Sequence, residues 1–189
     1  MRADAKANRN RLIEVAREGF GQRGLALSIH EIARNAGVGV GTVYRHFPTK
    51  EALVEAIAVA RLTSLLGEGQ ARLKARDPGT AFFDFLALLL SGDGSARGEV
   101  GRIARRARPT LAQVAAELRS VTEQLLQRAH KVGAVRNDVG IEEIMALARC
   151  VGLIGFAEAD LRRKVWQIMI DGLRSRGRRR VAKAKKRRR

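Results

Sequence analysis

The stretch SIHEIARNAGVGVGTVYRHF, Ser28–Phe47, decides the fold. Ser28 with Glu31 three residues later is the capping-box pattern that begins a helix. Gly37 supports a turn with positive φ, and a short second helix is expected from there to Phe47. Val43 is an apolar residue that would hold this second helix to a core. Two short helices joined through AGVG indicate a helix–turn–helix, in which the second helix enters the DNA major groove.

Several side chains in and around this stretch suit contact with DNA. Thr42 carries a short donor and acceptor that can reach a base edge. Tyr44, His46 and Lys50 can hydrogen-bond to or pair with phosphates, which positions the helix without reading sequence. His30, on the first of the two helices, is either a DNA contact or a plain exposed residue.

The same residues do not support an enzyme. The glycines of GVGVG lack the spacing of a Walker loop, and no strand is expected before them, as a dinucleotide fingerprint requires. His46 has no serine, cysteine or aspartate at a spacing that would make it a catalytic base. We therefore expect no catalytic residue, no cofactor and no bound metal.

Outward from this stretch, nearly every segment shows helical periodicity, and about nine helices are predicted. Pro48 and Thr49 begin a long fourth helix, DPG precedes an apolar helix over 82–90, and Pro109 begins a helix with heptad-spaced leucines and valines to about residue 130. KVGAVRNDVG predicts a turn. Two further helices are expected over 141–157 and 160–176, with Cys150 packed on the apolar side of the first.

Charge is unevenly distributed along the 189 residues. The formal net charge is +18, and the last fourteen residues, RGRRRVAKAKKRRR, contain ten basic residues and no acidic one. A run of like charges predicts a disordered arm for a polyanion, or only a solvated terminus. With a single cysteine, no apolar leader and no apolar run long enough to span a bilayer, the protein is expected to be cytoplasmic and to have no membrane partner.

Residues 8–53 closely resemble the DNA-binding domain of the TetR family of transcriptional regulators. The first helix with F-x-x-x-G, then IHEIARNAGVGVGTVYRHF and P-x-K-E-A-L keep the family's relative spacing. The resemblance implies an all-α homodimer with a C-terminal ligand-binding and dimerisation domain, usually a repressor released by a small molecule. Its DNA-contacting positions map to Ser28, His30, Gly39, Val40, Gly41, Thr42, Tyr44, Arg45, His46 and Lys50.

Two features depart from the family. Many members carry a polar side chain where Gly39 and Gly41 stand, so fewer side chains remain here to contact bases. The basic tail is not a family feature. The ligand, the residues that bind it and the operator cannot be identified from the sequence.

The predicted organisation has three parts. Residues 1–50 form the helix–turn–helix domain, 51–175 the effector-binding and dimerisation domain, and 176–189 the basic tail. Gly152 and Gly155 suggest close packing, so helices 141–157 and 160–176 are expected to form the homodimer interface, although these glycines could equally admit a core side chain. The predicted function is a regulator on a palindromic operator in double-stranded DNA. The alternative is an architectural protein whose tail coats DNA without sequence preference.

Overall fold

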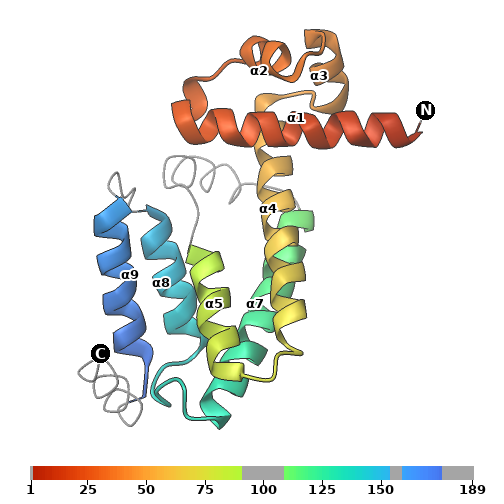
Figure 1. Ribbon diagram of the computed structural model, residues 1–189. Coiled ribbons are helices and arrows are strands. Elements are labelled where there is room, and N and C mark those ends of the chain that lie inside the picture. Colours follow the sequence, from red (N-terminus) through yellow and green to blue (C-terminus); the bar gives the residue numbers. More distant parts are fainter. Residues whose placement is uncertain (1, 91–108, 154–158, 176–189) are drawn as a thin grey trace. The chain divides into compact units, whose positions relative to one another are not determined.

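The computed structural model describes residues 2–90, 109–153 and 159–175, and it is all-helical (Figure 1). In these ranges the chain forms eight α-helices and one 3₁₀ turn, with no strand. The predicted all-α fold is confirmed. The chain divides into two compact units, and the division falls inside a helix, between Thr63 and Ser64.

The first unit is built on α1 (Arg2–Arg23), a 3₁₀ turn (Gly24–Ala26), α2 (Ile29–Ala36), α3 (Val40–His46) and the start of α4 (Lys50–Arg72). Helix α1 packs against α2, and α2 packs against α3. One apolar core joins these elements and includes Leu12, Ala16, Phe20, Leu27, Ile32, Ala33, Ala36, Val43, Phe47, Leu53 and Val54. The unit is the predicted three-helix helix–turn–helix.

Local signals set the helix ends in this unit as the sequence predicts. The Ser28 hydroxyl accepts a hydrogen bond from the backbone N–H of Glu31, and the Glu31 carboxylate accepts one from the backbone N–H of Ser28. Gly37 ends α2 in the left-handed conformation, with φ 67°. Thr49 caps α4 by accepting a hydrogen bond from the N–H of Ala52 at 3.1 Å. Each cap satisfies a backbone group that the helix itself leaves unpaired.

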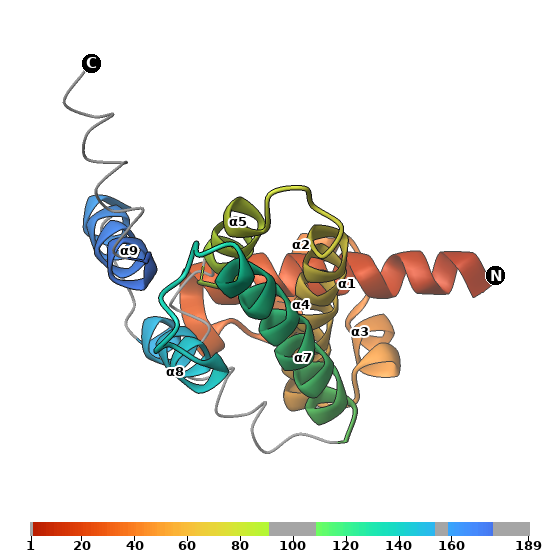
Figure 2. The same cartoon turned by 90° about the horizontal axis from the view of Figure 1, so that it is seen from below.

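The second unit holds the rest of α4, α5 (Pro78–Leu90), most of α7 (Pro109–Lys131), α8 (Ile141–Leu153) and α9 (Ala159–Leu173). Helix α8 lies between α9 and the pair formed by α5 and α7 (Figures 1 and 2). The buried side chains of this unit are mainly Phe82, Phe85, Leu86, Leu118, Val121, Leu125, Leu126, Ala129 and Ile144. Of the five heptad positions predicted on α7, four are buried, namely Leu111, Leu118, Val121 and Leu125, and Val114 is half-buried.

In the second unit, polar side chains form hydrogen bonds with backbone groups at the helix ends. Asp77 accepts hydrogen bonds from the N–H groups of Gly79 and Thr80, so α5 begins at Pro78, earlier than the residue 82 that the sequence predicted. The guanidinium of Arg128 on α7 donates to the carbonyl oxygens of Leu73 and Ala75, which follow α4. These contacts satisfy carbonyl groups that a helix end leaves without partners.

The last two helices agree with the sequence over the part that is described. Helix α8 is described to Leu153, and α9 runs from Ala159 to Leu173. The remainder of the predicted ranges 141–157 and 160–176, like the basic tail, lies outside the described residues. The predicted burial of Cys150 is wrong for the single chain, because its side chain is exposed. No helix in the described ranges has both the length and the apolar composition needed to cross a bilayer.

Candidate nucleic-acid interface

Helix α3 has one buried side and one exposed side. Val43 is fully buried, Val40 packs partly against the core, and Phe47, the residue after the helix, is 2% exposed. These positions are three and four residues apart, which places them on one side of a helix. The opposite side presents Tyr44 and Arg45 to solvent, together with a half-buried Thr42. The apolar side thus fixes the helix, and the polar side is available to a partner.

The three glycines of GVGVG have different structural roles. Gly37 adopts positive φ, a conformation that side chains rarely adopt. Gly39 is the N-cap of α3 with φ −69° and ψ 147°, a conformation open to any residue, and it makes no side-chain cap. A Cβ atom at Gly39 or Gly41 would meet nothing within 4 Å. The fold therefore requires the first glycine but not the other two.

Residues at the start of α2 include two predicted DNA contacts. His30 is exposed in the first turn of the helix. Ser28 is half-buried, and its hydroxyl donates its only hydrogen to Glu31 at 2.9 Å. In this conformation Ser28 has no hydrogen left for a phosphate oxygen, so its structural role is the helix cap.

The carboxylate of Glu31 is held ionised by its neighbours. The backbone N–H of Ser28, the guanidinium of Arg23 at 2.5 Å and the Ser28 hydroxyl lower the pKa of this carboxyl from 4.5 to about 2. Hydrogen bonds and a nearby positive charge favour the charged form. The ion pair between Arg23 and Glu31 also connects the end of α1 to the first turn of α2.

Aromatic rings lie beside three basic residues near the end of α3. The Lys50 ammonium lies 5.6 Å from the centre of the Phe20 ring, and the guanidinium of Arg9 lies 5.3 Å from the centre of the Phe47 ring. The ring of His46 is tilted against Phe47, with 6.3 Å between the ring centres. Cations over aromatic faces are held by electrostatic attraction to the ring. His46 and Lys50 are half-buried, so their side chains are partly fixed before any ligand arrives.

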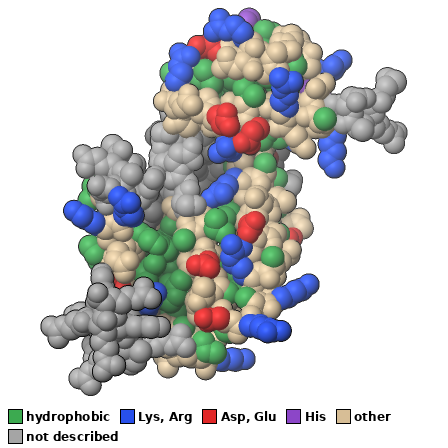
Figure 3. Space-filling model, in the orientation of Figure 1, with side chains coloured by type: hydrophobic (Ala, Val, Ile, Leu, Met, Phe, Trp, Pro, Cys, Tyr) green, Lys and Arg blue, Asp and Glu red, His purple; other side chains and the backbone are tan. Residues whose placement is uncertain are grey.

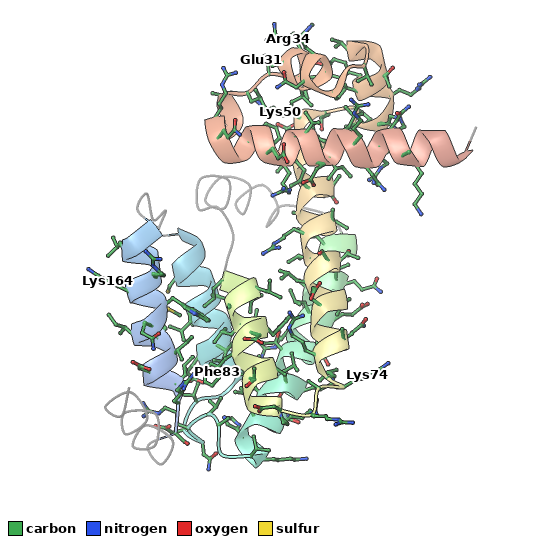
Figure 4. All side chains as sticks on the ribbon, in the orientation of Figure 1. Glu31, Arg34, Lys50, Lys74, Phe83 and Lys164 are labelled. Atoms are coloured by element: carbon green, nitrogen blue, oxygen red, sulfur yellow. The ribbon has the colours of Figure 1, made fainter. Side chains whose placement is uncertain are left out.

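The first unit also carries basic residues that the sequence did not single out. Arg34 is exposed on α2, four residues after His30, and points away from α1 (Figure 4). Arg9 is exposed on α1. Lys and Arg side chains surround the outline of this unit on the face shown in Figure 3. A positive charge on an exposed helix position is common, so the sequence alone gave no signal for these two.

Metal-binding and cavity-lining residues were also considered in the part of the chain that is described. No group of three or more histidine, cysteine, aspartate or glutamate side chains in those ranges could hold a metal ion.

The aromatic residues that could line a ligand cavity in the second unit differ in burial. Phe82 and Phe85 belong to the core, whereas Phe83 and Trp166 are half-buried. The Phe83 ring faces the guanidinium of Arg174 at 5.3 Å.

Two family models match the chain. Residues 12–57 match the model described as bacterial regulatory proteins of the tetR family, and residues 77–175 match that of the C-terminal domain of SbtR-like transcriptional regulators. An HTH-type transcriptional regulator of Staphylococcus aureus (strain USA300) is 46% identical over 54 residues, which cover 28% of this chain and 29% of that protein. The chain therefore spans less than a third of the length of this curated relative.

Solved structures match over nearly the whole chain. A TetR transcription regulatory protein from Mycobacterium vanbaalenii is 34% identical, with a TM-score of 0.67 over 92% of this chain and 98% of that one. The TetR transcriptional regulator SCO0520 from Streptomyces coelicolor is 25% identical, with a TM-score of 0.70 over 89% of this chain and 99% of that one. The similarity thus extends through both units.

Proposed function

Because the chain belongs to the TetR family of bacterial transcriptional regulators, whose members bind DNA and are not enzymes, we propose that it is a sequence-specific repressor released from its operator by a small molecule. The exposed side of α3 is the observation that carries this proposal. Its buried side, Val43 with Phe47, anchors the helix, and its free side offers hydrogen-bonding and basic groups.

The contacts divide into base readout and phosphate contacts. Thr42, Arg45 and His30 are the side chains that would distinguish one base pair from another. Tyr44, His46 and Lys50 would bind phosphates and fix the position of α3. Ser28 and Val40 also match DNA-contacting positions of the family, but here they would act mainly by stabilising the fold. Ser28 caps α2, and Val40 packs on the core.

Gly39 and Gly41 would allow a close approach to the DNA. Neither position is restrained by the fold, since added Cβ atoms there meet nothing in the chain. A backbone without side chains can lie nearer to the groove than one with them. Residues 39–46 would then occupy one major groove for each subunit.

The proposed homodimer uses helices 141–157 and 160–176. Leu161 and Ile168 on α9 are 49% and 71% exposed in the single chain, and their spacing of seven residues places them on one side of the helix, where a partner helix could cover them. A twofold dimer presents two identical heads, so the operator would be a palindrome with half-sites about one helical turn apart or a multiple of it.

The effector would bind within residues 51–175, the region that contains the match to the SbtR-like C-terminal domain. The effector can release the operator only if it binds more tightly to a dimer whose two DNA-binding units are spaced wrongly for the operator than to one whose spacing fits. Such a regulator would work in the cytoplasm, where the chromosome is.

A competition experiment tests the proposal. The full chain is bound to a labelled DNA fragment taken from upstream of its own gene, and unlabelled bulk DNA is added. A specific regulator retains its fragment against a large excess of competitor, because specific sites bind about 10³–10⁷ times more tightly than bulk DNA. Equal competition by bulk DNA would support the architectural alternative.

The basic tail is tested separately. Deleting residues 176–189 should flatten the slope of log K against log salt, because fewer counterions are released when fewer positive charges contact phosphates. The deletion should leave the preference for the native fragment in place. An unchanged slope would show that the tail does not contact DNA.

A further inference from the structure

Residues 6–11 of α1 are exposed on every side of the helix. The helix begins at Arg2, but its first core residue is Leu12, and residues 6–11 are all exposed. These turns extend beyond α2 and α3 in both ribbon views (Figures 1 and 2). They also precede residue 12, where the family model begins to match. The segment therefore adds little to the core, and the family's helix–turn–helix match does not include it.

Arg9 connects this exposed segment to the end of α3. Its guanidinium lies over the ring of Phe47, and Phe47 directly follows the last residue of α3. This contact is an electrostatic attraction to the ring and not a hydrogen bond to an oxygen, so the guanidinium keeps N–H donors for another acceptor. Arg9 is exposed, so these donors remain accessible to an oxyanion. A planar, fixed guanidinium is the group best suited to bidentate phosphate binding.

Lys6 lies three residues before Arg9, which places the two side chains on one side of α1. Both are exposed, and no described carboxylate lies within ion-pair distance of either. Farther along the same helix the situation differs: Arg17 pairs with Glu14 at 2.6 Å, and Arg23 pairs with Glu31 at 2.5 Å. Among the described side chains of α1, the basic residues with no ion pair therefore lie on its N-terminal turns, where Arg9 contacts Phe47.

We propose that Lys6 and Arg9 form a second phosphate-binding element, which contacts the DNA backbone beyond the base pairs that α3 reaches. This inference rests on the proposed DNA-binding function. Arg9 is positioned by Phe47 before DNA binds, and Lys6 adds a second charge farther along the helix. The two residues contact no bases. They enlarge the DNA-contacting surface of each subunit and fix its position along the DNA.

The test measures the salt dependence of binding. Full-length wild type, Lys6→Ala, Arg9→Ala and Arg9→Lys are titrated onto the upstream DNA fragment by fluorescence anisotropy at several salt concentrations. Lys6→Ala and Arg9→Ala should each reduce the slope of log K against log salt by about one for each bound subunit. Arg9→Lys should keep the slope but bind more weakly, because it retains the charge and loses the planar fork. Arg17→Ala is the matched control on the same helix and should leave the slope unchanged.

Ethylation interference locates the contacts. Ethylating phosphates outside the bases protected by α3 should weaken wild-type binding, and it should weaken binding of the Arg9→Ala variant less, because that variant retains only the Lys6 contact. Thermal unfolding of each variant shows whether loss of the Phe47 contact has changed the fold, and Lys6→Ala provides a test that removes no packing. Slopes equal to that of Arg17→Ala for both alanine variants would overturn the inference while leaving the DNA-binding function intact. Failure of the wild type to bind the fragment would overturn both.

Discussion

Replacing Gly41 with alanine separates what α3 needs in order to fold from what it needs in order to bind DNA. The residue is exposed, its φ is not positive, and an added Cβ meets nothing within 4 Å. Alanine is favoured over glycine in a helix, and it also reduces the freedom of the unfolded chain. We expect Gly41→Ala to increase the free energy of unfolding by about 0.4–1 kcal/mol. Denaturant unfolding followed by circular dichroism measures this gain.

The same substitution should weaken binding to DNA. If Gly41 lies against the groove, the added methyl group enters a closely packed interface, and overpacking costs about 1–3 kcal/mol. That corresponds to a loss of roughly five- to 150-fold in affinity. Anisotropy titration with the upstream fragment measures it. A variant that is more stable yet binds more weakly would show that the glycine serves DNA binding.

Gly37→Ala is the control, because it should have the opposite effect on stability. Gly37 has φ 67°, where alanine is strained, so this variant should unfold more easily by roughly 1–2 kcal/mol. If Gly41→Ala instead binds DNA as tightly as the wild type, then α3 does not approach the groove closely at this position. Gly41 would then have no role in the interface.

Three further outcomes follow from named side chains. Thr42→Ala should relax the preference for the native fragment, whereas Lys50→Ala should weaken all DNA alike; competition with mutated fragments distinguishes them. The pKa of Glu31 is lowered to about 2 in the folded protein, so the stability it contributes is complete above about pH 4.5 and is lost as the pH falls toward 2. Glu31→Gln should therefore reduce the loss of stability across this range, and an unchanged acid titration followed by circular dichroism would contradict that role. Ile168→Asp should give monomers with nearly unchanged chain stability, because the side chain is 71% exposed; an intact dimer in light scattering would refute the proposed interface.

Features that depend on neighbours in the sequence were predictable. The capping box of Ser28 and Glu31, the left-handed Gly37 and the Thr49 cap each involve residues within a few positions of one another, and all three formed as expected. Val43 was predicted to anchor α3 and is fully buried. The local signals sufficed because the helix–turn–helix is a compact unit with short connections.

Features that depend on distant parts of the chain were not predictable. The contact of Arg9 with Phe47 joins α1 to the end of α3, and nothing in either local sequence indicates it. The contact of Arg128 with the carbonyl groups after α4 likewise joins two segments that are far apart in the sequence. Cys150 was expected to be buried because its helix is largely apolar, but Ile144 is buried there while Cys150 is exposed. Periodicity identifies a helix, whereas the neighbouring elements decide which side of it is covered.

Phe47 belongs to both the core and the proposed interface. It is 2% exposed within the first unit, it follows α3 directly, and its ring carries Arg9. The packing of this core therefore positions both α3 and Arg9, the proposed phosphate-binding group. With Gly39 and Gly41 on its exposed side, α3 offers few side chains to bases, so in the proposed complex a larger share of the binding energy would come from phosphates. Such a balance predicts steep salt dependence together with moderate sequence discrimination, because phosphate contacts carry no base information.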